Sequence, residues 1–246
     1  MAAGGAASDT IQGARDHDRA ECAGVLVLAS LVLCGEAHES VVLHHWTRGL
    51  PTEETMMDIP VITLAYPAWL AGTIEWDRLY RTDEDKMALA IRLSRVNVTH
   101  GAGEPFGAAI FRSDDGRLVA VGMSQVVRQR NTILHAEVMA IMMAQHRLQA
   151  VHLRVGGQRH ALFSSCDPCA MCLGATHWSQ VTRLVCGATR DDAHHIGFDE
   201  GPVFPASYQY LEERGVAIVR GVQREEARAV IQAYATGGGL IHNRQG

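Results

Sequence analysis

The sequence lacks a long hydrophobic segment and an excess of basic charge. The apolar run Val25–Cys34 is too short to cross a membrane, so we expect no membrane as partner. Lysine and arginine number 22 against 27 aspartate and glutamate residues, which gives a formal net charge of -5. Because proteins that bind nucleic acid usually present a basic face, a nucleic acid is not the expected partner.

The chain also lacks the cysteine pattern of a disulfide framework. It has six cysteines, and Cys166, Cys169 and Cys172 are clustered within one short stretch. Clustered thiols in a chain of this length are more typical of metal binding than of disulfide pairing. Because a metal needs its cysteines reduced, we expect a cytoplasmic location.

By composition the chain divides into an N-terminal extension, residues 1–55, and one domain, residues 56–246. The first twenty or so residues are rich in Ala, Gly and Asp, as in disordered segments. No clear period follows as far as Glu54. An alternative explanation is that translation begins at Met56 or Met57 and that the upstream part is a start-site artefact. The sequence leaves both explanations open, and the motifs described below all lie downstream.

A pair of cysteines follows a signal for the start of a helix. Asp167 and Pro168 are favoured as N-cap and first residue, so we expect a helix to begin there. Cys169 and Cys172 would share one face of its first turn, where the helix dipole favours thiolates. Together with His135 they make a three-ligand zinc site with an open fourth position, which is typical of catalytic zinc.

A closed structural site is an alternative interpretation. Cys166 and Cys169 also have C-x-x-C spacing, so three cysteines and His135 would fill four positions around a metal. Glu137 favours the catalytic interpretation, because it follows His135 by two residues and would stand beside a zinc-bound water. H-x-E followed by P-C-x-x-C is the signature of zinc-dependent deaminases.

The order of elements predicts an α/β fold. Thr82 is a good N-cap for the first helix, and Asp114-Asp115-Gly116 is a turn that joins two strands into a hairpin. We expect helices over residues 82–97, 135–148, 168–178, 207–214 and 224–234, and strands over 106–111, 118–123, 160–164, 181–188 and 216–219. These elements suit a three-layer α-β-α domain with a mixed five-stranded sheet, in which both metal-bearing helices lie on one face.

Three segments of the chain resemble a known family. They are His135 to Val138, Ser165 to Ala175, and Ile196 to Gly201, which reads Ile-Gly-Phe-Asp-Glu-Gly. They resemble the cytidine deaminase superfamily and are most similar to bacterial guanine deaminases, including the type that accepts ammeline. The resemblance covers roughly residues 59–246. It implies the cytidine-deaminase-like fold, a Zn²⁺ cofactor, a small-molecule heterocyclic amine as substrate, and a homodimer in which the C-terminal tail caps an active site.

The resemblance implies roles at matching positions. His135, Cys169 and Cys172 would bind zinc, and Glu137 would carry a proton from the zinc-bound water to the leaving ammonia. Glu200 would bind the edge of the ring and shuttle a proton. The residues that would bind the substrate are Phe106, Ser124, Ala136, Trp178 and His242.

Three positions depart from the family pattern. The family usually has Asn where this chain has Ser124, Ala where it has Leu134, and Tyr where it has His242. Ser is shorter than Asn and cannot make the two-sided contact of an amide, while Leu134 would narrow the pocket. We therefore expect the reaction to be kept and guanine itself to be a poor substrate, because buried polar contacts dominate discrimination between similar rings.

The sequence predicts a zinc-dependent hydrolase that acts on C–N bonds of cyclic amidines. Its substrate would be a free guanine-like ring, namely an aminopurine, a pterin or an aminotriazine. One alternative is a deaminase of tRNA adenosine or of a (deoxy)cytidine- or guanosine-type nucleoside, and the low basic charge argues against tRNA. Another alternative is a non-catalytic, zinc-stabilised binding protein, which would have no need of Glu137.

Overall fold

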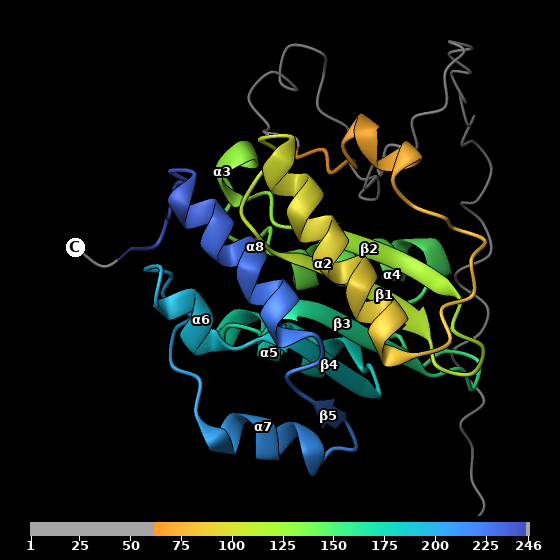
Figure 1. Cartoon of the computed structure of the whole chain (residues 1–246). Coiled ribbons are helices and arrows are strands. Elements are labelled where there is room, and N and C mark those ends of the chain that lie inside the picture. The colour runs from red at the N-terminus through yellow and green to blue at the C-terminus, as the bar shows by residue number, and fades with distance from the viewer. Residues whose placement is uncertain (1–61, 245–246) are drawn as a thin grey trace, which may run out of the picture. The chain divides into compact units, whose positions relative to one another are not determined.

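The structure, a computed structural model, describes residues 62–244, which contain a mixed five-stranded sheet (Figure 1). β1 pairs antiparallel with β2 and with β3, whereas β3, β4 and β5 run parallel to one another. The predicted α/β fold with a mixed five-stranded sheet is confirmed, while the predicted extension, residues 1–55, lies outside the described residues. In spatial order the strands are β2 (Leu118–Met123), β1 (Gly107–Arg112), β3 (His160–Cys166), β4 (Arg183–Ala188) and β5 (Ala217–Val219).

Helices cover both faces of this sheet. Figure 1 shows α2 and α8 side by side in front of it, with α4 and α5 behind it. None of the described helices is long and apolar enough to cross a membrane. The helices are η1 (Ala68–Gly72, a 3₁₀-helix), α2 (Asp83–Thr99), α3 (Val126–Gln129), α4 (Ala136–Leu148), α5 (Ala170–Ser179), α6 (Arg190–His194), α7 (Pro205–Glu212) and α8 (Arg224–Thr236).

The core has two halves because successive side chains of a strand point to opposite faces. In β1, Phe111 packs in the half that also contains buried residues of α2 and α8. Its neighbour Ile110 packs in the other half, with Met139 of α4 and Leu173 of α5. Both strand residues are fully buried, so the sheet is the central layer between two helical layers.

Two glycines allow helices to lie directly on the sheet. A Cβ atom at Gly122 of β2 would come within 2.0 Å of the carbonyl oxygen of Ala136, at the start of α4. A Cβ atom at Gly107 of β1 would come within 2.4 Å of the carbonyl oxygen of Ala90 in α2. Any larger residue would therefore push the helix away. Gly122 thus fixes the height of α4 above the sheet at the end that carries His135.

Predicted helix boundaries agree with the structure to within two residues: α7 begins and ends two residues earlier than expected, and α5 begins two residues later. Thr82 caps α2 as predicted, because its hydroxyl accepts a hydrogen bond from the backbone N–H of Asp85. Asp167 does not cap α5, since its carboxylate is bound by the Arg220 guanidinium and by the backbone N–H of Arg190. Cys169 is the N-cap instead.

Candidate active site

Two helices begin at one place and bring their first residues together. His135 is the N-cap of α4, and Cys169 is the N-cap of α5, with Cys172 in the first turn of the same helix. The Nδ1 atom of His135 lies 3.5 Å from the Sγ of Cys169 and 3.6 Å from the Sγ of Cys172. The structure therefore gathers the three residues that the sequence nominated as metal ligands, although His135 is 34 positions from Cys169 in the chain.

These three atoms have the chemistry and spacing of a zinc site. A tetrahedral zinc ion lies about 2.3 Å from a thiolate and about 2.0 Å from an imidazole nitrogen, which separates the two donors by about 3.6 Å. The distances from His135 to the two sulfur atoms match that separation. Among the His, Cys, Asp and Glu side chains of residues 62–244, these three form a cluster that could hold a metal ion.

The two thiols differ in their tendency to ionise. The hydrogen bond from Cys172 and that with His135 lower the pKa of Cys169 to about 4, against the effect of burial. The pKa of Cys172 is raised well above its usual value by its interaction with Cys169 and by burial. Cys169 is therefore the thiol that most readily becomes the thiolate a metal requires.

Cys166 does not belong to this group of possible ligands. It ends β3, and its thiol donates a hydrogen bond to the backbone carbonyl of Thr189. Burial raises its pKa well above the usual value, which disfavours a thiolate. The alternative of a closed site with three cysteines therefore has no support in the described part of the chain.

Glu137 is buried directly beside the three possible ligands. Its side chain accepts a hydrogen bond from the Ser164 hydroxyl at 3.0 Å and one from the Cys172 thiol at 3.3 Å. Burial, followed by the negative charge of Cys169, raises the pKa of Glu137. A carboxyl group with a raised pKa can both take and return a proton near neutral pH.

Glu200 stands on another wall of the same pocket. It lies after α6, and its backbone carbonyl accepts a hydrogen bond from Ala170, the first residue of α5. Burial and the negative charges of Cys169 and Glu137 raise the pKa of Glu200 to about 8. The pocket holds about 390 Å³ of empty space including its opening, and is lined by Phe106, Ser124, His135, Ala136, Glu137, Cys166, Asp167, Cys169, Phe198, Glu200, His242 and Asn243.

Two sequence expectations about the pocket are wrong for this chain. Trp178 does not line it, because its side chain is 75% exposed and lies against His177. Six residues after Cys172, it is turned by about 240° around α5, at roughly 100° per residue. Leu134 does not narrow the pocket either, since it is buried in the core half that contains α4.

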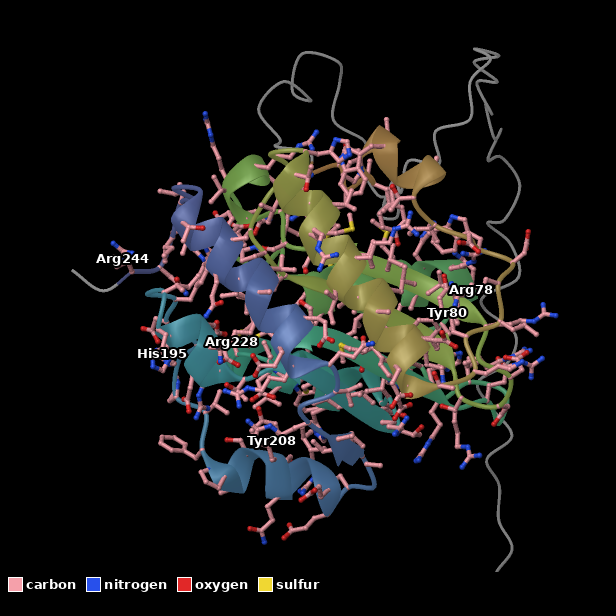
Figure 2. The ribbon with its side chains drawn as sticks, in the orientation of Figure 1. Arg78, Tyr80, His195, Tyr208, Arg228 and Arg244 are labelled. Atoms are coloured by element: carbon pink, nitrogen blue, oxygen red, sulfur yellow. The ribbon has the colours of Figure 1, made fainter. Side chains whose placement is uncertain are left out.

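The C-terminal tail carries His242 into the pocket of its own chain. Asn243 Nδ2 donates a hydrogen bond to the backbone carbonyl of Asp199 at 2.6 Å, and Arg244 donates one to the carbonyl of Ile196. Figure 2 shows Arg244 in this tail, on the side of the molecule that also carries His195, the residue after α6. In this single chain the tail thus lies over the pocket of its own chain, and the homodimer stays a prediction.

Sequence reasoning missed two buried residues that contact this site. Ser164, on β3, is 27 positions from its partner Glu137, and Glu104 is 20 positions from its partner Ser124. Glu104 is fully buried and its carboxylate accepts a hydrogen bond from the Ser124 hydroxyl at 2.7 Å. A glutamate among glycines and a proline reads as a loop residue, so the sequence carries no local signal of its burial.

Comparison with known proteins agrees with this geometry. Residues 80–188 match the family described as the cytidine and deoxycytidylate deaminase zinc-binding region. A guanine deaminase from Bacillus subtilis (strain 168) is 35% identical over 127 residues, which are 52% of this chain and 78% of the relative. A solved structure of a guanine deaminase from Nitrosomonas europaea is similar with a TM-score of 0.67 and 36% identity, over 70% of this chain and 94% of that one. A tRNA-specific adenosine deaminase from Haemophilus influenzae is 29% identical over 161 residues, covering 63% of this chain and 84% of the relative.

Proposed function

We propose that this chain, which belongs to the cytidine and deoxycytidylate deaminase family, hydrolyses a free guanine-like ring and releases ammonia. The observation that carries this proposal is the meeting of His135, Cys169 and Cys172 with the buried carboxyl of Glu137 beside one pocket, which His135, Cys169 and Glu137 line. Guanine deaminases are among the most similar relatives, which supports a guanine-like substrate for this chain.

His135, Cys169 and Cys172 would hold a zinc ion beside the pocket. When bound there, zinc lowers the pKa of water and so supplies a nucleophile at neutral pH. Both cysteines stand at the N-terminus of α5 and His135 at that of α4, so the helix dipoles favour negative charge at this point. This arrangement would favour both sulfur atoms as thiolates once zinc is bound.

Glu137 is placed to carry a proton during the reaction. It would accept one from the attacking water and return it to the amino group, which then leaves the ring as ammonia. The raised pKa of Glu137 suits both transfers, because the group holds a proton more tightly than an ordinary carboxylate does. Ser164 holds one carboxyl oxygen in place through its hydroxyl.

The remaining walls would hold the ring. Phe106 and Phe198 pack edge to face with ring centroids 5.0 Å apart and form an apolar side of the pocket. Glu200, with a pKa raised to about 8, would hydrogen-bond a ring edge that bears an N–H and an amine. An apolar wall with a few polar groups is the usual composition of a small-molecule site.

Ammonia release from a panel of compounds tests the function. The zinc-loaded protein is incubated with guanine, 2,6-diaminopurine, melamine, ammeline, pterin, cytosine and guanosine, and with an RNA hairpin that presents one unpaired adenosine. We expect turnover of at least one free ring and none of the hairpin. RNA adenosine is the second candidate substrate, because a relative is a tRNA-specific adenosine deaminase. The net charge of -5 argues against an RNA partner. No ammonia from any compound, with zinc bound, would refute the proposal.

A further inference from the structure

A further carboxyl group, that of Glu104, lies behind the wall of the pocket and has no part in the chemistry described so far. Glu104 belongs to the loop between α2 and β1 and is fully buried. One of its oxygen atoms accepts the hydrogen bond from the Ser124 hydroxyl, and the other accepts one from the backbone N–H of Val127 at 3.0 Å. Both hydrogen bonds tie the loop before β1 to the segment after β2.

Ser124 is held through its backbone groups, and its hydroxyl is oriented by the hydrogen bond to Glu104. Its backbone N–H donates to the carbonyl of Phe106 at 3.1 Å. Its own carbonyl accepts from the side chains of Asn97 at 2.9 Å and of Gln125 at 3.1 Å. A serine has a single O–H, and Ser124 donates it to Glu104. What remains toward the pocket is an oxygen atom that can only accept a hydrogen bond.

His242 lies on the same side of the pocket. Its Nδ1 atom lies 3.5 Å from the other carboxyl oxygen of Glu104. Glu104 thus contacts two residues of the pocket lining, Ser124 and His242.

We propose that Glu104 determines the specificity of the pocket by fixing the Ser124 hydroxyl as a hydrogen-bond acceptor. The preferred substrate is then an aminated heterocycle that presents an N–H, either an amino group or a ring N–H, to Ser124. This inference rests on the proposed function, and it narrows the substrate from any guanine-like ring to rings with a donor at that edge. Glu104 itself acts through Ser124 and is a positioning residue.

The candidate rings differ at the edge opposite the reactive amine. In melamine all three amino groups donate, so whichever edge faces Ser124 offers an N–H. Pterin carries unprotonated pyrazine nitrogens at that edge, and two facing acceptors repel each other. The loss of one buried hydrogen bond costs about 10- to 100-fold in affinity. We therefore expect aminotriazines and N–H-bearing purines to be preferred over pterin.

The experiment compares kcat/KM for melamine, guanine and pterin between the wild type and two variants, with Ki used for any ring that is not turned over. Ser124→Ala removes the acceptor, and we expect about a 10- to 100-fold loss for the donor-bearing rings and little change for pterin. Glu104→Gln offers an amide donor to Ser124, whose hydroxyl is then free to donate to the ring. The preference for melamine over pterin should fall at least about tenfold.

Two further variants separate specificity from folding. Ser179→Ala removes an equally buried hydroxyl, which bonds within α5, and we expect it to leave the ratio of melamine to pterin unchanged. Ser124→Thr keeps the hydroxyl and should retain the wild-type preference. Equal losses for every ring in Ser124→Ala, or an unchanged ratio in Glu104→Gln, would overturn the inference. Absence of ammonia release from every ring by the zinc-loaded wild type would instead refute the proposed function.

Discussion

Ser164→Ala tests whether the buried hydroxyl on β3 positions the carboxyl group that carries the proton. Ser164 Oγ donates to Glu137 at 3.0 Å, and both residues are buried. A hydrogen bond to a charged partner contributes about 1.5–3 kcal/mol, and this one acts on the group that moves the proton. If the whole amount is lost in the transition state, kcat falls by roughly 10- to 150-fold.

The assay is steady-state ammonia release with the best substrate, together with zinc content by elemental analysis. We expect kcat to fall while KM and zinc content stay near the wild-type values, because Ser164 is outside both the metal group and the pocket lining. Ser94→Ala is the matched control, since Ser94 is equally buried in α2 and donates to the carbonyl of Ile91. If kcat falls no more in Ser164→Ala than in Ser94→Ala, the hydroxyl does not position Glu137.

Three other outcomes can be measured. Glu137→Gln should retain zinc and lower kcat by roughly 10²–10⁴-fold or more, and near-normal turnover would remove Glu137 from the mechanism. Cys169→Ser should lower the zinc content and the melting temperature, whereas Cys166→Ala should keep zinc, and full occupancy in Cys169→Ser would show a different ligand set. Burial of Asp192 is outweighed by hydrogen bonds from Arg224 and Thr189, which bring its pKa to about 2. The stability it contributes is therefore present above about pH 4 and is lost as the pH falls toward 2. In Asp192→Asn this part of the acid dependence of the unfolding free energy should be missing.

Local patterns predicted the fold and the possible metal ligands well. The cap at Thr82 and the turn at Asp114-Asp115-Gly116 act within a few residues, and the structure has α2 and the β1–β2 hairpin where these signals place them. The metal-binding motif is also local, because His135 lies at the start of one helix and the cysteine pair at the start of another. The prediction that Trp178 lines the pocket was wrong, because the position of this residue around α5 depends on where the helix begins and which side of it faces the sheet.

The features that the sequence did not predict depend on tertiary contacts. Asp167 looks like an N-cap, but Arg220, which follows β5, takes its carboxylate and moves the cap to Cys169. The short helix α3 spans only Val126–Gln129 and ends at Arg130 in a left-handed conformation, so no periodic pattern announces it. These features arise from partners that are distant in the chain, where spacing carries no information.

The same reasoning changes how the departure at Ser124 is understood. From the sequence alone, a serine in place of asparagine is a loss of one contact to the ring. The structure shows that the hydroxyl is committed to Glu104 at 2.7 Å, so the two positions act as one unit. An asparagine placed at position 124 would turn its amide N–H toward the same carboxyl group and leave its carbonyl oxygen toward the ring. The wall would then still present an acceptor, so an exchange of serine for asparagine at position 124 keeps the polarity of the pocket, and a reversal of that polarity requires a change at position 104.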